Sequence, residues 1–289
     1  MSDRKIIEPN SVTEQLLYST VRISGDVGTG TGFFFKYPIN ESSHVELILT
    51  NKHVVNGNNT LDFYFHEAVS INGISNPTNK SFRIQLNDFS GIWIPHPDQN
   101  VDLGALFFVP IRDYAKKIMQ KDIFSILFDE NLIKNDDALE KETDVAEGIL
   151  MIGYPIGLWD HLNNFPIIRK GIAATHPALD FQDKSVGVVD IACFPGSSGS
   201  PIIIYESGAY YDKQSKATKI GQKVILLGLL FSGPVHASDG KIEIKEIPTQ
   251  SVPIAQINQF IHLGYYVKAK EVLVLCEYIK STLTKEQNL

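Results

Sequence analysis

The sequence is poor in cysteine, with only Cys193 and Cys276 among 289 residues. Such scarcity excludes a disulfide scaffold and is typical of proteins from a reducing compartment. The sequence also lacks any run of about 18 apolar residues, the length that a membrane-spanning helix needs. Residues 1–9 lack the apolar stretch of a secretory signal. We therefore expect a cytoplasmic protein that has no membrane partner.

An excess of positive charge is missing as well. The chain carries 26 Lys and Arg against 33 Asp and Glu, a net charge of −7, so we expect no nucleic-acid partner. Its eight histidines show no pair at the spacing of metal ligands, and we expect neither a metal nor another cofactor. With 43% hydrophobic residues, the chain can bury a sizeable core, either as one large domain or as two packed barrels.

Short β-like runs separated by turn residues dominate the chain, which predicts an all-β fold. Residues 12–110 hold enough of these runs for an N-terminal barrel, and residues 148–265 hold enough for a C-terminal one. Residues 111–147 are charged and compatible with helix, which predicts a helical linker between the barrels. In residues 266–289 apolar side chains recur at mostly helical spacing, which predicts an amphipathic C-terminal helix packed on a barrel.

The most informative motif is FPGSSGSP at residues 194–201. Within it, Ser198 has Gly196 two residues before it and Gly199 directly after it. This framing favours a tight turn that exposes the hydroxyl and directs nearby backbone N–H groups toward a reacting carbonyl. Serine hydrolases need such a turn, because an alcohol is a poor nucleophile without a base and an oxyanion site. The alternative is a purely structural turn serine, since Gly-Ser runs are common in loops.

A histidine and an aspartate upstream stand in contexts that suit the same chemistry. His53 follows the apolar residues 47–49 and a short polar turn, at the end of an expected strand. Asp102 directly precedes the apolar run 103–108, so its carboxylate can be held behind an imidazole. Asp102 follows His53 by 49 residues and Ser198 follows Asp102 by 96, which is the chain order of a chymotrypsin-type triad.

Other residues compete for these roles. His96, in the string PHP, is the nearest rival of His53 but has no apolar strand before it. Asp98 and Asp88 compete with Asp102, although neither leads directly into an apolar run. We therefore favour His53 as the base and Asp102 as its partner.

Three further patterns point elsewhere and are weaker. The string GTGTG at residues 28–32 lacks the Lys-Ser/Thr of a phosphate-binding loop and precedes three phenylalanines, which favours a hairpin entering a barrel. Cys193 can be imagined as a nucleophile, but its apolar strand favours a buried small residue. Ser200 stands where the G-x-S-x-G motif of an α/β-hydrolase needs glycine, which disfavours that fold.

Together these motifs resemble a trypsin-like serine peptidase of the chymotrypsin fold, with the nearest likeness to the bacterial HtrA/Deg-type protease domain. The resemblance implies two six-stranded antiparallel β-barrels, the first carrying His53 and Asp102 and the second carrying Ser198. We expect no PDZ domain. The resemblance covers residues 12–265 and is carried by TNKHVV at 50–55, DLGAL at 102–106, IGYP at 152–155 and DIACFPGSSGSP at 190–201.

The resemblance also implies site residues. The backbone N–H groups of Gly196 and Ser198 would form the oxyanion hole. Because Ala192 supplies no charge at the pocket floor, we expect cleavage after an uncharged residue, small or medium and apolar. The residues implied to form the substrate pocket are Ala192, Phe231, Ser232 and Gly233.

The chain departs from secreted trypsin relatives before its nucleophile, where Ser197 replaces the aspartate that pairs with a newly cut N-terminus. We therefore expect no activation by that switch. The sequence predicts a regulatory serine endopeptidase that cleaves protein or peptide substrates through an acyl-enzyme, with room for a regulatory protein partner. The alternative is a catalytically silent trypsin-like fold that acts as a binding or sensor module, which the departures at Ser197 and Ser200 keep open.

Overall fold

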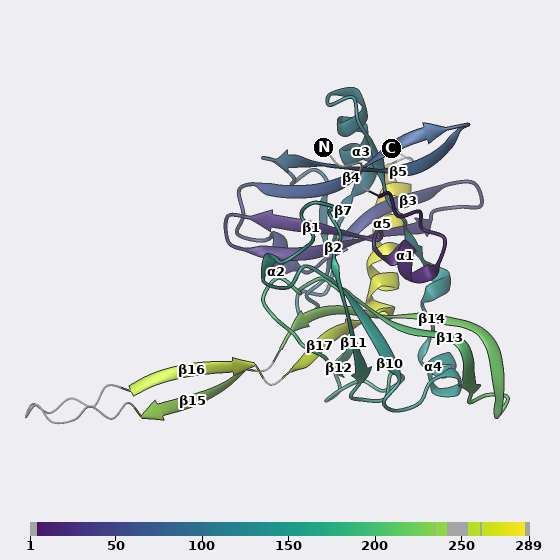
Figure 1. Ribbon diagram of the computed structural model, residues 1–289, viewed down its shortest axis with the longest axis vertical. Helices are drawn as coiled ribbons and strands as arrows, with labels where there is room; N and C mark the ends of the chain where they lie inside the picture. The colour runs from purple at the N-terminus through teal and green to yellow at the C-terminus, as the bar shows by residue number, and fades with distance from the viewer. Residues whose placement is uncertain (1–4, 234, 242–253, 261, 287–289) are drawn as a thin grey trace, which may run out of the picture.

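The computed structural model describes residues 5–233, 235–241, 254–260 and 262–286. Figure 1 shows two β-rich units, one above the other, with the C-terminal helix α5 (Lys270–Glu286) running alongside both. The predicted all-β class with two antiparallel units is confirmed. No helix in the described ranges has both the length and the apolar character needed to cross a bilayer.

The N-terminal unit is a nine-stranded sheet in which seven strands follow the order β5-β4-β1-β2-β3-β7-β6. The prediction had six strands here. The two strands off this path, β8 on β4 and β9 on β2, come from residues 111–147, which the sequence predicted as a helical linker. These two strands are too short to show a periodic pattern in the sequence. They form because β4 and β2 each offer an edge with which they can pair. The strands are β1 (Thr20–Gly25), β2 (Thr29–Pro38), β3 (His44–Thr50), β4 (Leu61–Ile71), β5 (Ile74–Leu86), β6 (Trp93–Pro95), β7 (Gly104–Phe107), β8 (Asp122–Phe124) and β9 (Phe128–Asp129).

The C-terminal unit is a closed barrel of six strands, β10-β11-β12-β17-β14-β13, as predicted. β15 (Val235–Lys241) pairs with β16 (Ile254–Phe260) in a separate two-stranded sheet. Residues 234, 242–253 and 261 of the predicted barrel segment lie outside the described residues. The barrel strands are β10 (Gly148–Gly153), β11 (Ile167–Ala173), β12 (Val186–Asp190), β13 (Pro201–Asp212), β14 (Ala217–Ser232) and β17 (Leu263–Lys268).

Helices occupy the connections and the C-terminal end. The predicted helix of residues 266–289 begins at Lys270, because residues 266–268 belong to β17 and close the barrel; residues 287–289 lie outside the described part. The other helices are α1 (Val12–Leu16), α2 (Lys52–Val55), α3 (Phe108–Lys117) and α4 (Asp136–Glu142), with 3₁₀ turns η1 (Glu130–Leu132) and η2 (Pro155–Gly157).

Three consecutive phenylalanines in β2 show how the two units share a core. Phe33 and Phe35 pack into a cluster that contains residues of both units and of α5, whereas Phe34 packs into the interior of the first sheet. Successive side chains of a strand face opposite sides, so this apolar run serves both cores. From α5, Val272 and Ile279 fill the shared cluster. Burial at ~25 cal/mol per Å² of apolar area therefore holds the two units in one arrangement.

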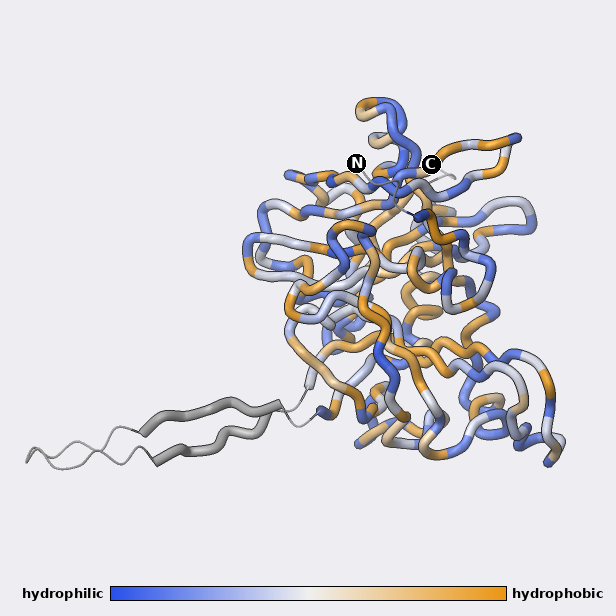
Figure 2. The backbone as a smooth tube through the Cα atoms, viewed as in Figure 1, coloured by the Kyte–Doolittle hydropathy of each residue, from blue (hydrophilic) through white to orange (hydrophobic). Residues whose placement is uncertain are grey.

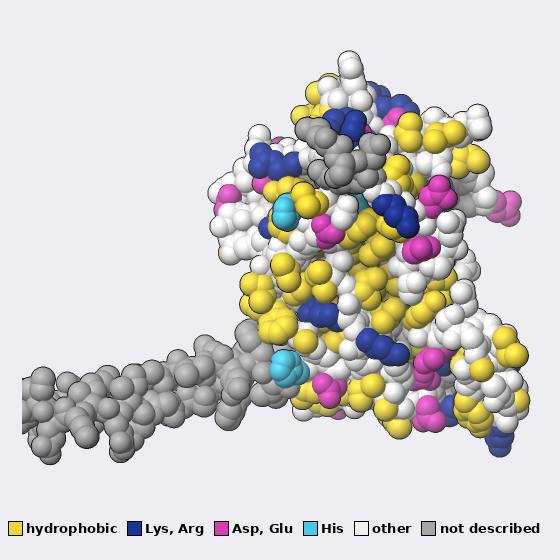
Figure 3. Space-filling view, viewed as in Figure 1, with side chains coloured by type: hydrophobic (Ala, Val, Ile, Leu, Met, Phe, Trp, Pro, Cys, Tyr) yellow, Lys and Arg dark blue, Asp and Glu magenta, His cyan; other side chains and the backbone are white. Residues whose placement is uncertain are grey.

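The distribution of hydropathy follows this division. Figure 2 shows hydrophobic segments gathered inside both units and hydrophilic segments at many of the turns. On the face seen in Figure 3, hydrophobic side chains also gather where the units meet, with single Lys or Arg side chains among them. Apolar surface is thus exposed at the joint between the units on this face.

Candidate active site

The structure brings His53 and Asp102 into contact. His53 Nδ1 lies 2.5 Å from Asp102 Oδ2, and the backbone N–H of His53 donates to Asp102 Oδ1 at 3.1 Å. The carboxylate therefore holds the Nδ1 proton in place and leaves Nε2 as the proton acceptor. The His53 side chain is 49% exposed and that of Asp102 is 25% exposed, so the imidazole faces the cleft with the carboxylate behind it.

Short local elements set this pair. His53 lies in the single-turn helix α2, directly after β3, and Asp102 lies in the loop before β7. β3 and β7 are neighbouring antiparallel strands, with Thr50 opposite Gly104, so the end of one lies beside the start of the other. Asn51 Nδ2 also donates to the backbone oxygen of Asp102 at 2.6 Å. The two catalytic candidates are thus joined by strand pairing as well as by their own side chains.

Ser198 lies on a turn that only glycine permits. Gly196 has φ +85° and Gly199 has φ +84°, a region that L-residues rarely adopt. A Cβ added to Gly199 would lie 1.9 Å from the backbone oxygen of Thr31. Gly199 N–H donates to Leu230 O at 2.7 Å, which ties the turn to β14. The Gly framing of the motif is therefore a steric requirement.

The backbone around the turn presents unpaired N–H groups. Ile156 N–H donates to Pro195 O at 2.5 Å, and a trans peptide directs the N–H of Gly196 the opposite way. In the described part of the chain, neither Gly196 N nor Ser198 N donates to a protein acceptor. Ile156 makes its bond from a left-handed conformation, φ +53°, that costs a β-branched residue energy. The two N–H groups predicted for the oxyanion hole are thus free to bind one.

Thr31 connects this turn to the first sheet. Its Oγ1 donates to Gly196 O at 3.2 Å and accepts from Tyr154 N–H at 3.2 Å. Its backbone N–H donates to Ser198 O at 2.8 Å. A residue of the first unit therefore holds the nucleophile turn of the second. The GTGTG string that contains Thr31 enters β2 from the β1–β2 turn, which confirms the predicted hairpin.

Arg169 lies behind the turn and was not singled out from the sequence. Its Nη2 donates to Ser197 Oγ at 3.0 Å, and its Nη1 donates to the backbone oxygen of Ala192. Burial lowers the pKa of the guanidinium from its ordinary value. The available signal was a pair of cations, Arg169 and Lys170, in an otherwise apolar strand. Successive side chains of a strand face opposite sides, so one of the two must face the barrel interior and needs a partner there.

Two cavities flank the triad candidates. One of about 480 Å³ is lined by His53, Ser198, Gly196, Thr29 and Ile156, among others. Ser198 and His53 thus line the same cavity. No hydrogen bond joins their two side chains among the described residues. Catalytic hydrogen bonds are often long before substrate binds, so the absence of one here is compatible with a nucleophile and its base.

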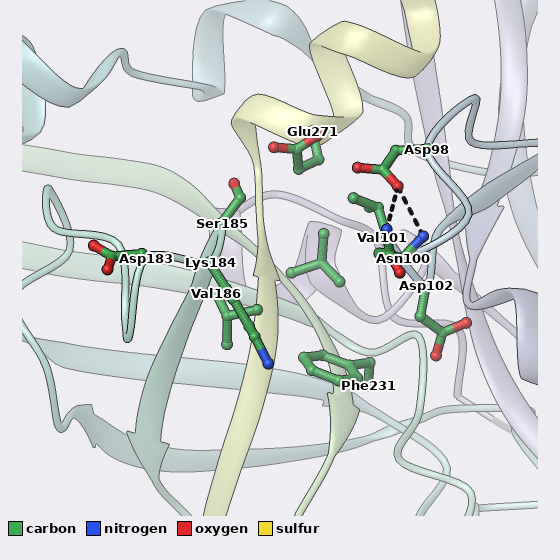
Figure 4. A pocket seen from close by; sticks show the side chains of 11 residues that line it. Asp98, Asn100, Val101, Asp102, Asp183, Lys184, Ser185, Val186, Phe231 and Glu271 are labelled. Carbon is green, nitrogen blue, oxygen red and sulfur yellow. Dashed lines mark hydrogen bonds between the residues drawn. The ribbon is translucent and has the colours of Figure 1, made fainter.

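The other cavity, of about 550 Å³, lies on the Asp102 side and is shown in Figure 4. In the view of Figure 4 the loop that carries Asp98 and Asp102 stands across from Lys184, and Phe231 lies at the lower end. Lys184 and Glu271 lie on its other walls, so charged groups of both signs surround one aromatic ring. Ser198 and His53 line the first cavity and Asp102 lines the second.

The predicted substrate-pocket residues lie on two neighbouring segments. Phe231 is partly buried and lines the Asp102-side cavity, while Ser232 is exposed. A Cβ added to Gly233 would lie 3.7 Å from Cys193 Cβ, so the two expected walls are close together. The backbone oxygen of Ala192 is occupied by Arg169. Ala192, Phe231, Ser232 and Gly233 remain a prediction as a specificity pocket.

The rival residues have other partners. His96 is buried, accepts from Asp98 N–H at its Nδ1 and lies 3.3 Å from Glu271 at its Nε2. Asp98 Oδ1 accepts from the backbone and side chain of Asn100 (Figure 4). Asp88 accepts hydrogen bonds from Ser90. Among the described residues, no three His, Cys, Asp or Glu side chains gather in a way that could hold a metal ion.

Comparisons with known proteins concern the fold. No protein-family model and no curated protein matches the chain. Similar solved structures include Rv3671c from M. tuberculosis H37Rv in an inactive form, 15% identical over 96% of both chains with a TM-score of 0.44. Human heparin binding protein is 10% identical over 97% of this chain and 95% of that one, with a TM-score of 0.47.

A third similar structure is the thermostable serine protease AL20 from an extremophilic microorganism. It is 10% identical, covers 93% of this chain and 99% of its own, and has a TM-score of 0.43. At such identities and scores the likeness is one of chain path and assigns no role to any residue. None of these comparisons tests the nearer likeness to HtrA/Deg-type domains, which stays a prediction. The solved structures similar to this chain are thus those of trypsin-like serine proteases and their relatives.

Proposed function

We propose that the chain is a serine endopeptidase that hydrolyses protein or peptide substrates through an acyl-enzyme. The observation that carries this proposal is the 2.5 Å contact between His53 and Asp102 beside a cavity that Ser198 also lines. In a soluble scaffold, a carboxylate-oriented imidazole and a glycine-framed serine at one cavity support nucleophilic acyl transfer.

The chemistry follows from these positions. Ser198 Oγ attacks the peptide carbonyl while its proton passes to His53 Nε2. The N–H groups of Gly196 and Ser198 donate hydrogen bonds to the oxyanion, and the C–N bond breaks as His53 returns the proton to the leaving amine. Water, deprotonated by His53, then attacks the acyl-enzyme and releases the acid and Ser198. Asp102 stabilises the imidazolium during both acylation and deacylation. Loss of one oxyanion donor typically raises the activation barrier by about 3–4 kcal/mol.

We also propose that the protein has a regulatory role in the cytoplasm. Its substrate is a protein or peptide, and a regulatory protein is a further partner. Arg169 supports a turn that is already formed, because it supplies from within the chain a partner for Ser197. On the substrate, we propose an uncharged apolar residue before the cut, since Phe231 and Ala192 carry no charge into the expected pocket. Strong cleavage after Arg or Lys in a peptide library would contradict that preference.

The competing function is a silent fold that binds without cleaving. The missing hydrogen bond between the Ser198 and His53 side chains, among the described residues, favours it. Purified protein treated with a fluorophosphonate probe separates the two functions, because the probe reacts only with an activated serine.

We expect wild-type labelling that disappears in Ser198→Ala and in His53→Ala. The matched control is Ser207→Ala, which removes an exposed hydroxyl of β13 outside the nucleophile turn and should label like wild type. Thermal melting of each variant shows whether it is folded. Labelling that survives in Ser198→Ala, or a folded wild type that never labels, would contradict the peptidase proposal.

A further inference from the structure

Arg22 of β1 is a buried cation without a counter-ion. Only 8% of its surface is exposed, and no carboxylate pairs with it among the described residues. Its Nε is buried without a hydrogen-bond partner, and neither Nη atom donates to a described protein acceptor. A buried charge left unpaired is costly, and a fold that keeps one needs a reason for it.

Two aromatic rings contact the guanidinium, and with Nε buried its Nη atoms are the part left to meet a ligand. Its central carbon lies 4.2 Å from the ring centroid of Trp159 and 5.0 Å from that of Tyr64. Both rings lie within the range of a cation–π contact, which stabilises the charge without using its N–H donors. Tyr154 is close enough to interact electrostatically with Arg22. It does not neutralise the charge, because burial raises the pKa of its phenol and keeps the phenol protonated. The donors are therefore held in a fixed direction with nothing to bind.

Strand register places Arg22 next to the residue that holds the nucleophile turn. In the sheet it stands opposite Thr31 on one side and Tyr64 on the other. Residues opposite one another in antiparallel strands point to the same face, at about 5 Å between their Cα atoms. Thr31 Oγ1 donates to Gly196 O on that face. Arg22 thus lies one strand away from the oxyanion turn.

Gly157 and Thr29 connect Arg22 to the cavity. A Cβ added to Gly157 would lie 3.5 Å from Arg22 Nη2 and 3.8 Å from Thr29 Oγ1. A Cβ added to Gly196 would lie 3.0 Å from the same Thr29 Oγ1. Arg22, Thr29, Gly157 and Gly196 are therefore contiguous, and Thr29 and Gly196 line the cavity that His53 and Ser198 share.

That cavity receives the leaving fragment. His53 gives its proton to the departing amine, so the fragment that departs must extend along the cavity wall that His53 forms. Two residues of extended chain span about 7 Å, enough to pass from the scissile bond over the turn toward Thr29. Thr29 and Ile156 lie on this side, whereas Phe231 and Asp102 line the opposite cavity.

We propose that Arg22 binds a carboxylate of the leaving fragment, within about two residues of the cut. The carboxylate comes from an Asp or Glu side chain or from the C-terminus of the substrate itself. This assignment rests on the proposed peptidase function, which defines the leaving side. It makes Arg22 a specificity residue, since a fork of N–H donors recognises a planar carboxylate in two contacts.

A structural role for Arg22, as a support for Trp159 and the loop 155–165, is the competing explanation. Both roles need the guanidinium, so stability alone does not separate them. Binding of carboxylate ligands does, because a purely structural arginine gives the same affinity for charged and neutral peptides.

The experiment uses Ser198→Ala protein, so that no cleavage occurs, and follows the Arg22 Nε–H signal by ¹⁵N-edited NMR. Loss of one signal in Ser198→Ala/Arg22→Gln assigns it. Three probes are titrated: Ala-Gln amide, Ala-Glu amide and Ala-Gln with a free C-terminal carboxylate. We expect at least one carboxylate probe to shift the signal with a Kd about tenfold or more below that of the neutral amide, as a charge-assisted hydrogen bond gives. The probe that does so identifies the source of the carboxylate.

The matched control is Ser198→Ala/Arg83→Gln, which makes the same charge change at an exposed arginine that pairs with Asp62. It should bind as the parent does, whereas Arg22→Gln should lose the preference for the carboxylate. Equal affinity for all three probes, or equal loss in both arginine variants, would overturn the proposal. Because this readout needs no catalysis, a wild type that fails to label with fluorophosphonate defeats the peptidase proposal alone. Labelling without any carboxylate preference defeats only the role of Arg22.

Discussion

Arg169 donates a hydrogen bond from Nη2 to the hydroxyl of Ser197, 3.0 Å away, and so fixes the residue directly before Ser198. The same guanidinium donates to the backbone oxygen of Ala192 on the other side of the turn. One internal cation therefore spans the segment 192–197. The nucleophile turn is braced from behind by the chain itself.

Replacing Arg169 should uncouple this turn. In Arg169→Ala the Ala192 oxygen loses its Arg169 donor, and the Ser197 hydroxyl keeps only the long hydrogen bond from Phe194 N–H at 3.4 Å. The N–H groups of Gly196 and Ser198 should then lose their fixed direction. We expect the fluorophosphonate labelling rate to fall about 10²-fold, the scale of losing an oxyanion donor. Arg169→Lys, which keeps one charged donor, should recover part of the rate. A lower melting temperature with an unchanged labelling rate would make the role structural only.

Asp102→Asn tests the orientation of the imidazole. The amide can donate toward His53 Nδ1 and so favours the tautomer with its proton on Nε2, which cannot accept from Ser198. We expect labelling or hydrolysis to fall by about 10⁴-fold with little change in melting temperature. Asp88→Asn is the matched control, since Asp88 is exposed and, in the part of the chain that the structure describes, its side chain bonds only to Ser90. A small effect in Asp102→Asn would mean that His53 is oriented in another way.

Gly199→Ala tests the steric requirement at the nucleophile turn. The new Cβ would lie 1.9 Å from the Thr31 oxygen at a φ of +84°, so the backbone must move. We expect a loss of more than about 3 kcal/mol in the free energy of unfolding, together with loss of labelling. In Gly73→Ala, φ is +79° but nothing lies within 4 Å, and the loss should be about 1 kcal/mol. Equal losses by chemical denaturation would refute the clash.

His66 predicts how stability depends on pH. Burial lowers the pKa of its imidazole from 6.5 to about 4, and its Nε2 has no hydrogen-bond partner. Between these two values the unfolded chain binds a proton that the folded chain excludes, so stability falls as the pH drops from 6.5 toward 4. The expected slope from this residue approaches about 1.4 kcal/mol per pH unit.

His66→Gln removes that titration while keeping a polar side chain of similar length. The difference in unfolding free energy between wild type and variant should therefore change with pH over this window and be constant above pH 7. Urea denaturation at several pH values measures it. Parallel curves from pH 4 to 7 would show that the folded protein accepts the proton at His66.

Local patterns in the sequence were informative where a residue type has few uses. The glycines around Ser198 predicted a turn, and the structure shows positive φ at Gly196 and Gly199. The helical spacing of the C-terminal segment predicted α5, whose apolar side fills the shared core. His53 and Asp102 were paired from their positions at a strand end and a strand start, and they lie in contact. Their catalytic roles await the experiments above.

The tips of the long hairpins were not apparent from the sequence. The β4–β5 pairing extends to Ile71, which lies opposite Ile74. The β13–β14 pairing extends to Asp212, which lies opposite Ala217. The outer residues of these strands are largely exposed whether apolar, as at Ile71, Ile74 and Ile220, or polar, so the sequence there shows no alternation of buried and exposed positions. These strands exist because each already has a partner to continue along.

By itself the sequence determined the all-β class, the turn at Ser198 and the amphipathic C-terminal helix, because each depends on residues close together in the chain. Only the tertiary structure decided the partners of Arg169, Arg22 and Thr31. Arg169 meets Ser197 from 28 residues away, and Thr31 meets Gly196 from 165. No local pattern encodes such contacts, since the first arises when the strands of one barrel close and the second when the two units pack together. The site lies at that joint, and its shape is a property of the packing.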